Sequence, residues 1–416
     1  MVKSAREVAG SSSVSSADAL DHDLAPYFPE LRKFSSTRKL EKSPVYLQIK
    51  PVVQRVLNSV VHGDFSTTTL FRPAHPGVIR ATAWNIERGI RLERVIATLR
   101  EHPLLSRSDV FLLTELDHGM ARSGNRPIAR EIASALGLQY VFAPCYINLN
   151  KGSGLEIEAK GENSLALHGN ALFARFPLLF GHSIALPNGK DKMQGKEKRL
   201  GCQRAVVALV DHPLGKFWAV SVHLDAHSTQ RHRRDQMRIV LDHVERLRPQ
   251  HPVLIGGDWN TSTYNSKRAT YSILGYCRRV AMGVQHVIKN HYPYPESWFE
   301  RHLFRELDRR GYIWRDLNEL GACTLHYDVK DLALNRNMGD WIPKWCFWFI
   351  NWALEKNTGN EGRCSFKLDW FAGRGIVPSG PQKPMVVHDI RQKEHLSDHD
   401  PIILDFRPSN ATGPHV

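Results

Sequence analysis

The sequence predicts an α/β fold built as a layered sandwich, rather than a purely parallel sheet. Strand-like and helix-like segments alternate from about residue 76 onward, which is typical of α/β proteins. A β-hairpin is also expected, because two strand-like stretches, 204–210 and 217–223, flank a turn signal at 211–215. Hairpins pair antiparallel strands and crossover helices join parallel ones, so both kinds of pairing are expected in one domain.

The individual elements follow from short hydrophobic patterns. Residues 91–102 predict a helix, because Leu92, Val95, Ile96 and Leu99 recur at helical spacing on one face. Apolar runs bounded by turn residues predict strands instead. The other expected helices lie at 127–137 and 229–247. The expected strands lie at 78–84, 110–113, 139–144, 170–173, 204–210, 217–223, 253–256, 368–371 and 402–406.

The chain divides into a polar beginning and one large domain. Residues 1–75 are expected to form a polar N-terminal arm, flexible up to residue 45, with a short helix at 46–62. The main domain is expected at 76–408 and a short tail at 409–416. An aromatic and basic insertion, at about 262–366, interrupts this domain before its last strands.

Composition limits the partners and the cell compartment. The chain has 416 residues, of which 42% are hydrophobic, enough for a sizeable core. Its net charge of +14 favours a polyanionic partner, either nucleic acid or an anionic membrane surface. No secretory signal is visible, and no run reaches the roughly 18 apolar residues of a membrane-spanning helix. We therefore expect a cytoplasmic protein, and the sequence implies no obligate protein partner.

Four tryptophans of the insertion share one helical face. Trp341, Trp345, Trp348 and Trp352 follow the spacing i, i+4, i+7, i+11. Packing inside the insertion would explain this stripe. A helix lying at a membrane interface would explain it too, and so would a surface that stacks on bases. Peripheral membrane contact through these four residues is therefore one hypothesis.

Polar side chains that suit catalysis follow several of the expected strands. Gly257-Asp258-Trp259-Asn260 ends one apolar run, and Ser397-Asp398-His399-Asp400 leads into the last one. Because a rigid sheet can aim groups at its strand ends, these residues are expected to meet in one cleft. The residues found at such strand ends are Asn85, Glu87, Glu115, His223, Asp258, Asn260, Asp369, Asp398 and His399.

Three of these residues suit a hard divalent cation. Phosphate ester hydrolysis needs a cation that neutralises charge on the phosphoryl oxygens. Mg²⁺ takes oxygen ligands and is usually held by one or two carboxylates together with water. Glu115 and Asp398, with Asn85, supply a site of that type for Mg²⁺ or Mn²⁺.

The remaining residues suit the attacking water and the developing negative charge. A water must be deprotonated and aimed, which suits a carboxylate beside an amide, as in Asp258 and Asn260. A histidine made basic by a buried carboxylate is a cationic donor, and His399 paired with Asp369 fits that description. Attack by water in one step is expected, because no positioned Ser or Cys nucleophile is visible.

The order of these motifs resembles the endonuclease/exonuclease/phosphatase superfamily, which has the DNase I-like fold. The resemblance covers about residues 76–408 apart from the insertion, and it implies a four-layered α/β/β/α sandwich. The matching stretches are TAWNIERG (82–89), LLTELD (112–117), HGNALFARFPL (168–178), QRAVVALV (203–210), VSVHLDAH (220–227), VLIGGDWNT (253–261), KLDWF (367–371) and HLSDHDPI (395–402).

The resemblance implies the same roles for the residues named above and adds three. It implies that His223 lies near the phosphate or the leaving group, and that Asn170 and Arg204 line the cleft for the substrate. Thr114 stands where the family usually has Gln before the metal-binding Glu, and Trp259 is a bulky residue for its position.

The function expected from this resemblance is that of a metal-dependent phosphoesterase of the nuclease type. A membrane-associated lipid phosphodiesterase, similar to sphingomyelinases or phosphoinositide phosphatases, is an alternative that the tryptophan stripe supports. A binding protein that keeps the fold without the catalysis is another, but such a protein need not retain the full acidic and histidine set.

Overall fold

The computed structural model describes residues 19–66, 73–261, 269–328, 363–390 and 396–409. The tryptophan stripe at 341–352 lies outside the described residues, as do residues 1–18 and 410–416.

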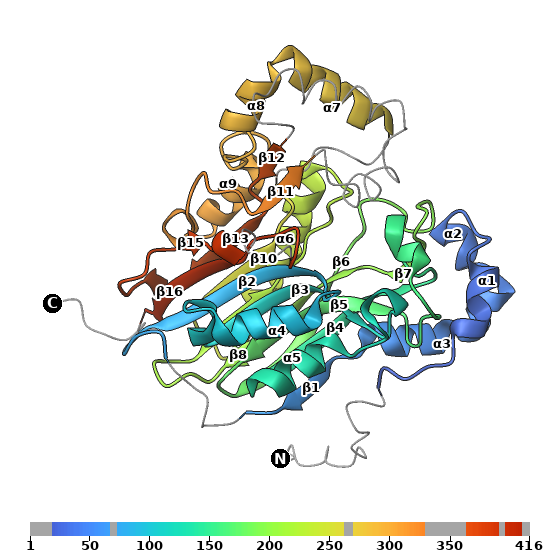
Figure 1. The fold of residues 1–416 in the computed structure, drawn as a ribbon, viewed down its shortest axis with the longest axis horizontal. Coiled ribbons are helices and arrows are strands. Elements are labelled where there is room, and N and C mark those ends of the chain that lie inside the picture. The colour runs from blue at the N-terminus through green and yellow to red at the C-terminus, as the bar shows by residue number, and fades with distance from the viewer. Residues whose placement is uncertain (1–18, 67–72, 262–268, 329–362, 391–395, 410–416) are drawn as a thin grey trace, which may run out of the picture.

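The larger of two main sheets carries the first part of the domain. Its strand order is β1-β4-β5-β3-β2-β16-β14, with β7 paired to β4 and β15 to β16 (Figure 1). The pair β2–β3 is parallel, and the other pairs of this sheet are antiparallel. Its strands are β1 (Val61–Asp64), β2 (Ile79–Arg88), β3 (Val110–His118), β4 (Gln139–Asn148), β5 (Leu167–Ala174), β7 (Arg199–Gly201), β14 (Ile376–Pro378), β15 (Met385–Val386) and β16 (Ile402–Pro408).

The second main sheet has the order β13-β10-β9-β8-β6. Only β9 and β10 are parallel among its described pairs. The pair β8–β9 is the expected hairpin, with Val210 opposite Phe217 next to its turn. Its strands are β6 (Leu178–Leu186), β8 (Gln203–Val210), β9 (Phe217–Ser221), β10 (Val253–Asp258) and β13 (Asp369–Arg374).

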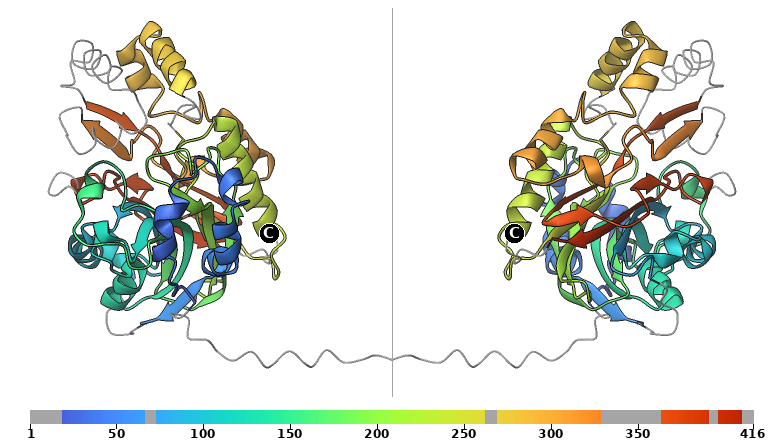
Figure 2. Two further views of the ribbon diagram at one scale, coloured as in Figure 1. Left: turned by 90° about the vertical axis from the view of Figure 1, so that its right-hand side faces the viewer. Right: turned by 90° about the vertical axis from the view of Figure 1, so that its left-hand side faces the viewer.

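The two sheets pack against each other through an apolar layer, and helices cover their other faces. Leu112 and Leu172 of the larger sheet share one buried cluster with Val206 and Leu254 of the second sheet. Helices α3 (Pro44–Asn58), α4 (Leu92–Glu101) and α5 (Ile128–Leu136) contribute to the core on the far side of the larger sheet. Helices α6 (Gln230–Val244) and α9 (Arg301–Arg309) do so for the second sheet (Figure 2). The expected mixed α/β class is confirmed.

The predicted helices and strands of the main domain are present, but several strands are longer than expected. The apolar run at 110–113 predicts a short strand, whereas β3 continues to His118. Strand β2 likewise continues to Arg88. The pairing register between these strands shifts after Asn85, and that between β3 and β5 shifts after Leu113. Such bulges re-aim side chains near the end of a strand, which is where the candidate site residues lie.

Residues 19–45 differ from the expected flexible arm. They contain two short helices, α1 (Phe28–Leu31) and α2 (Thr37–Leu40), ahead of α3. Leu24, Leu31 and Leu40 are buried in the core beneath the larger sheet. These leucines are widely spaced in polar sequence, so no periodic pattern reveals that they pack together.

The described part of the insertion contains helices and one pair of antiparallel strands. Helices α7 (Ala269–Ala281) and α8 (Val284–Asn290) lie at one end of the molecule, away from the two main sheets (Figures 1 and 2). Strands β11 (Leu325–Asp328) and β12 (Arg363–Phe366) pair antiparallel. Among the described residues, no helix combines the length and apolar character needed to cross a lipid bilayer.

Candidate active site

The candidate site lies where strained strand ends of both sheets meet. Glu115, near the bulge of β3, has a φ of 59°, and Asn260, just after β10, has a φ of 52°. Glu87, at the end of β2, has a φ of 47°. Positive φ values are uncommon for residues with a side chain and tend to cluster at functional sites, where the surrounding structure holds them.

Asn85 joins carboxylates from the two sheets. Its Nδ2 donates a hydrogen bond to Glu115 Oε1 at 3.2 Å and to Asp258 Oδ2 at 3.1 Å. His223 lies on the same two carboxylates, with Nε2 4.0 Å from Glu115 Oε1 and 3.5 Å from Asp258 Oδ2. Residues far apart in the sequence, from β2, β3, β10 and the end of β9, therefore form one cluster.

Buried positive charge keeps Glu115 ionised. Burial alone raises the pKa of this carboxyl. The charges of Arg88, His223 and His168, together with the hydrogen bond that Asn85 donates, lower the pKa by more than burial raises it. The net pKa lies well below its ordinary value. Glu115 is therefore an anionic oxygen donor at neutral pH.

Glu87 adds a third carboxylate that our interpretation of the sequence left without a role. Burial raises its pKa to about 7, and the charge of Asp398 adds to this effect. Arg88 and Arg91 oppose it, and Glu115 raises the pKa further. Glu87 thus shares its surroundings with both acidic residues expected at a metal. The sequence signal was present in Asn85-Ile86-Glu87-Arg88-Gly89, where the glutamate follows the asparagine by two positions.

Asp258 and Asn260 form a compact turn at the end of β10. The backbone N–H of Asn260 donates to Asp258 Oδ1 at 2.9 Å, and its side-chain Nδ2 donates to the Leu224 carbonyl at 3.0 Å. Burial raises the pKa of Asp258 to about 6, while the charges of His399 and His223 act in the opposite direction. A carboxyl with that pKa can take up a proton near neutral pH.

His399 and Asp369 form a buried pair beside Asp258. His399 Nδ1 lies 2.7 Å from Asp369 Oδ2, and the other ring nitrogen lies 3.8 Å from Asp258 Oδ2. Burial disfavours the imidazolium, but Asp369, Asp258 and Asp398 together raise the pKa of His399 well above its ordinary value. His399 is therefore a cation in this arrangement.

Backbone contacts fix the segment that carries Asp398 and His399. Ser397 Oγ donates to the Asn85 carbonyl at 2.7 Å and accepts from the His399 N–H at 3.1 Å. Trp84 Nε1 donates to the His399 carbonyl at 2.8 Å. Strand β2 thus holds the loop before β16 in place, on the side where Asn85 meets the carboxylates.

Asn170 and Arg204 relate to the cluster differently. Asn170 Oδ1 accepts from the Glu115 N–H at 3.3 Å, so it supports the bulge that presents Glu115. Asn170 Nδ2 donates to the Arg204 carbonyl at 2.8 Å. The Arg204 guanidinium instead donates to Ser183 of β6 and to Asn58 of α3, at 3.1 and 2.6 Å. The structure therefore links Arg204 to the cluster through its backbone, and its guanidinium binds other elements.

The basic loop before β8 also uses its charges inside the protein. Lys192 pairs with buried Asp225 at 3.1 Å, and Lys198 donates to backbone carbonyls of the N-terminal segment. Arg199 pairs with Glu197. These cations therefore anchor the loop to the rest of the protein.

The structure thus combines a mixed α/β fold of two facing sheets with a cluster of carboxylate, amide and histidine side chains at their strand ends. The sequence model of the Endonuclease/Exonuclease/phosphatase family matches residues 82–352 of this chain. The chain belongs to that family, whose members are phosphoesterase hydrolases. A comparison with curated proteins found no match.

A comparison with solved structures found similar chains, among them the following three. One is an endonuclease/exonuclease/phosphatase from Beutenbergia cavernae, at 15% identity and a TM-score of 0.46, covering 80% of this chain and 72% of the other. Another is a 3′-5′ exonuclease from Neisseria meningitidis, at 14% identity and a TM-score of 0.44, covering 79% and 100%. A third is the human nocturnin catalytic domain, at 17% identity and a TM-score of 0.39, covering 83% and 96%.

Proposed function

We propose that this protein hydrolyses phosphodiester bonds with the help of a divalent cation, and that water attacks the phosphorus directly. The main support is the arrangement around Asn85, which contacts Glu115 and Asp258 at once, with the His399–Asp369 pair beside them. One cluster thus combines an anionic oxygen donor in Glu115, a base in Asp258 whose pKa lies at about 6, and a buried, positively charged imidazole in His399.

The residues present fit a hard cation. Glu115, Asp398 and Glu87 bring carboxylates into a shared environment: burial raises the pKa of Glu87, and the charges of Asp398 and Glu115 raise it further. Glu115 and Asp398 would hold Mg²⁺ or Mn²⁺, and Asn85, whose Nδ2 contacts Glu115 and Asp258, would complete the shell or orient it. When bound, the ion would neutralise charge on the phosphoryl oxygens.

The protein's own groups would perform the proton transfers and hold the phosphate. Asp258 would take the proton of the attacking water, because it is the carboxyl whose pKa lies near 6. Asn260 would orient that water or a phosphoryl oxygen. His399, held cationic by Asp369, would stabilise the charge that develops on phosphorus, and His223 would face the leaving group.

A nucleic acid is the substrate class that we favour. The net charge of +14 suits a polyanion, and phosphate contacts by basic residues make binding steeply dependent on salt. The cytoplasmic location expected from the N-terminal sequence stays a prediction. A lipid phosphodiester is the competing class, and it depends on the tryptophan stripe outside the described residues.

A substrate panel tests the proposal. Purified protein with Mg²⁺ or Mn²⁺ is assayed on plasmid DNA, RNA, sphingomyelin, phosphatidylinositol phosphates and bis(p-nitrophenyl) phosphate. We expect cleavage of nucleic acid, lost in Asp258→Ala and in His399→Ala while both variants keep the wild-type circular dichroism spectrum. Cleavage of lipids alone would favour the lipid phosphodiesterase. Near-wild-type rates in either variant would show the proposed roles to be wrong.

A further inference from the structure

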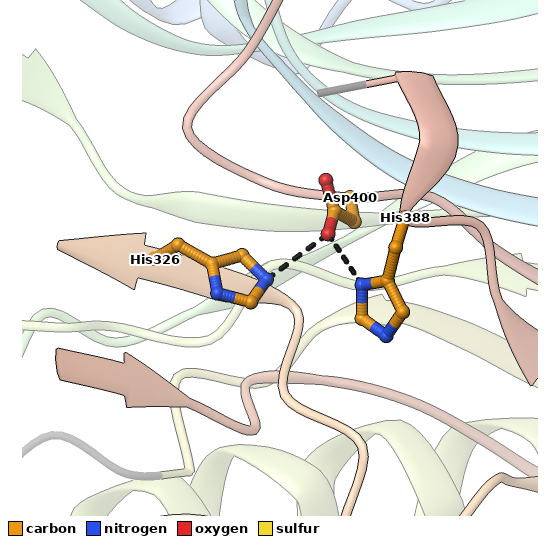
Figure 3. A group of neighbouring side chains, drawn as sticks. All are labelled: His326, His388 and Asp400. Carbon is orange, nitrogen blue, oxygen red and sulfur yellow. Dashed lines mark hydrogen bonds and ion pairs between the residues drawn. The ribbon is translucent and has the colours of Figure 1, made fainter. Parts of the chain in front are cut away.

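A second group of metal-binding side chains lies outside the catalytic cluster. His326 of β11, His388 from the segment after β15 and Asp400 just before β16 converge on one point (Figure 3). Their ligand atoms all lie within 4.8 Å of one another. The other such group found among the described residues is Asp258, Asp369 and His399 of the catalytic cluster.

Both imidazoles contact the same carboxylate oxygen. His326 Nε2 lies 3.0 Å and His388 Nδ1 lies 2.7 Å from Asp400 Oδ2. Without a cation, each of these nitrogens needs a proton to donate to that oxygen. The ligand atoms of a tetrahedral zinc ion are about 3.3 Å apart, so small side-chain movements would admit an ion in place of the two protons.

The surroundings of His326 are those of a metal ligand. Its other ring nitrogen, Nδ1, lies 2.8 Å from Ser365 Oγ on β12. Histidines that bind metals almost always use their second nitrogen in this way, because the contact fixes the ring and its tautomer. If Nδ1 donates to Ser365, the lone pair of Nε2 faces Asp400, an arrangement that a cation between them would stabilise.

The three side chains differ in burial, so the site is closed to solvent at Asp400 and accessible at His388. Asp400 has 2% of its side chain exposed and His326 has 15%, whereas His388 has 43%. An ion could therefore enter past His388, and water could fill the remaining coordination positions.

We propose that His326, His388 and Asp400 form a binding site for a divalent transition-metal ion, with Zn²⁺ as the reference ion. Two imidazoles and one carboxylate suit zinc and its neighbours in the first transition row, whereas Mg²⁺ prefers oxygen ligands. The site is separate from the cation site proposed for catalysis, because it uses none of the same side chains.

The ion would tie the insertion to the segment that carries His399. The Asp400 N–H donates to the Thr324 carbonyl at 2.7 Å, and Leu325 forms an isolated β-bridge with His399. Thr324 Oγ1 also accepts from the Asp369 N–H at 3.1 Å. Thr324 and Leu325, at the start of β11, therefore contact the backbone of both members of the catalytic pair, and a metal bound by His326 would fix β11 there.

Zinc titration of the full-length protein tests this site. Chelator-treated protein is titrated with Zn²⁺ against a chromophoric competitor, in excess Mg²⁺, and in a Glu115→Gln background that removes the main ligand of the catalytic cluster. We expect one Zn²⁺ per chain in both backgrounds. His388→Ala and His326→Ala should each weaken binding by more than about tenfold. Co²⁺ should give a visible absorption band that both substitutions abolish.

Two controls keep the result interpretable. His102→Ala removes a histidine that pairs with the carboxylate of Asp389 at 3.2 Å, and it should leave zinc binding unchanged. Thermal melting should show Zn²⁺ stabilising the wild type but not His388→Ala, whose half-buried side chain is replaceable without unfolding. Equal zinc affinity in the wild type and both histidine variants, loss of zinc in Glu115→Gln alone, or equal weakening in His102→Ala would overturn the proposal.

Discussion

The pair of Asp369 and His399 gives the sharpest test of the catalytic assignment, through the substitution Asp369→Asn. The asparagine keeps the size of the side chain but removes the negative charge 2.7 Å from His399 Nδ1. Since Asp369 is the largest favourable contribution to the imidazolium, its loss should lower the pKa of His399.

The size of the effect follows from the burial of the pair. The two side chains have 4% and 0% of their surface exposed, so water screens their interaction little. A charge-assisted hydrogen bond of this kind contributes about 1.5 to 3 kcal/mol. At about 1.4 kcal/mol per pKa unit, the pKa of His399 should fall by about 1 to 2 units.

The assay is the pH dependence of kcat/KM for Mn²⁺-dependent hydrolysis of a small phosphodiester. A catalytic imidazolium makes the rate fall at high pH, where the ring loses its proton. In Asp369→Asn this alkaline limb should move to lower pH by about 1 to 2 units, in line with the pKa change. Asp109→Asn is the matched control, because it alters another buried aspartate at the opposite end of β3. An unmoved alkaline limb in folded Asp369→Asn would refute the role of the pair.

Three further predictions follow from the same structure. The wild-type rate should fall as the pH drops below about 6, because burial raises the pKa of Asp258 to that value and the base must be ionised; a rate independent of pH between 5 and 8 would contradict this. Glu115→Gln should weaken Mn²⁺ binding, measured by electron paramagnetic resonance, and leave the melting temperature little changed. The loss should exceed about 10- to 100-fold, which is the usual effect of removing a residue that only hydrogen-bonds a metal ligand. Burial raises the pKa of Asp109 to about 7, against about 3.9 unfolded, so between these values the folded state holds a proton that the unfolded state has lost. As pH rises from about 4 to 7, the free energy of unfolding of the wild type should therefore fall, relative to that of Asp109→Asn, by at most about 4 kcal/mol. Denaturant titrations of both proteins measure this difference, and the same pH dependence in both would contradict it.

The strand-end motifs indicate which side chains can meet, because the geometry of a sheet is strict. Each polar residue follows an apolar run, so the fold brings Asn85, Glu115 and Asp258 to neighbouring strand ends. The contact between Asp369 and His399 joins residues 30 positions apart, and the sequence suggested it through chemistry, because a buried carboxylate makes a histidine basic.

Other features depend on tertiary contacts that no local pattern records. The Arg204 guanidinium binds Asn58 of α3, a helix outside the expected domain. Leu24 and Leu31 lie in sequence that is too polar to predict burial. The raised pKa of Glu87 comes from its burial, and the charge of Asp398, from the other end of the chain, adds to it. Likewise, His326 and Asp400 meet although 74 positions separate them.

In the proposed mechanism, one cluster holds the cation and the scissile phosphate together. Anomalous diffraction at the manganese edge, from crystals soaked with Mn²⁺ and a non-hydrolysable phosphodiester, tests it most directly. We predict a manganese peak bonded to the carboxylates of Glu115 and Asp398, with the phosphate between it and His399. A fully occupied ligand whose phosphate lies away from Glu115 and His399, or manganese bound only elsewhere, would contradict the account.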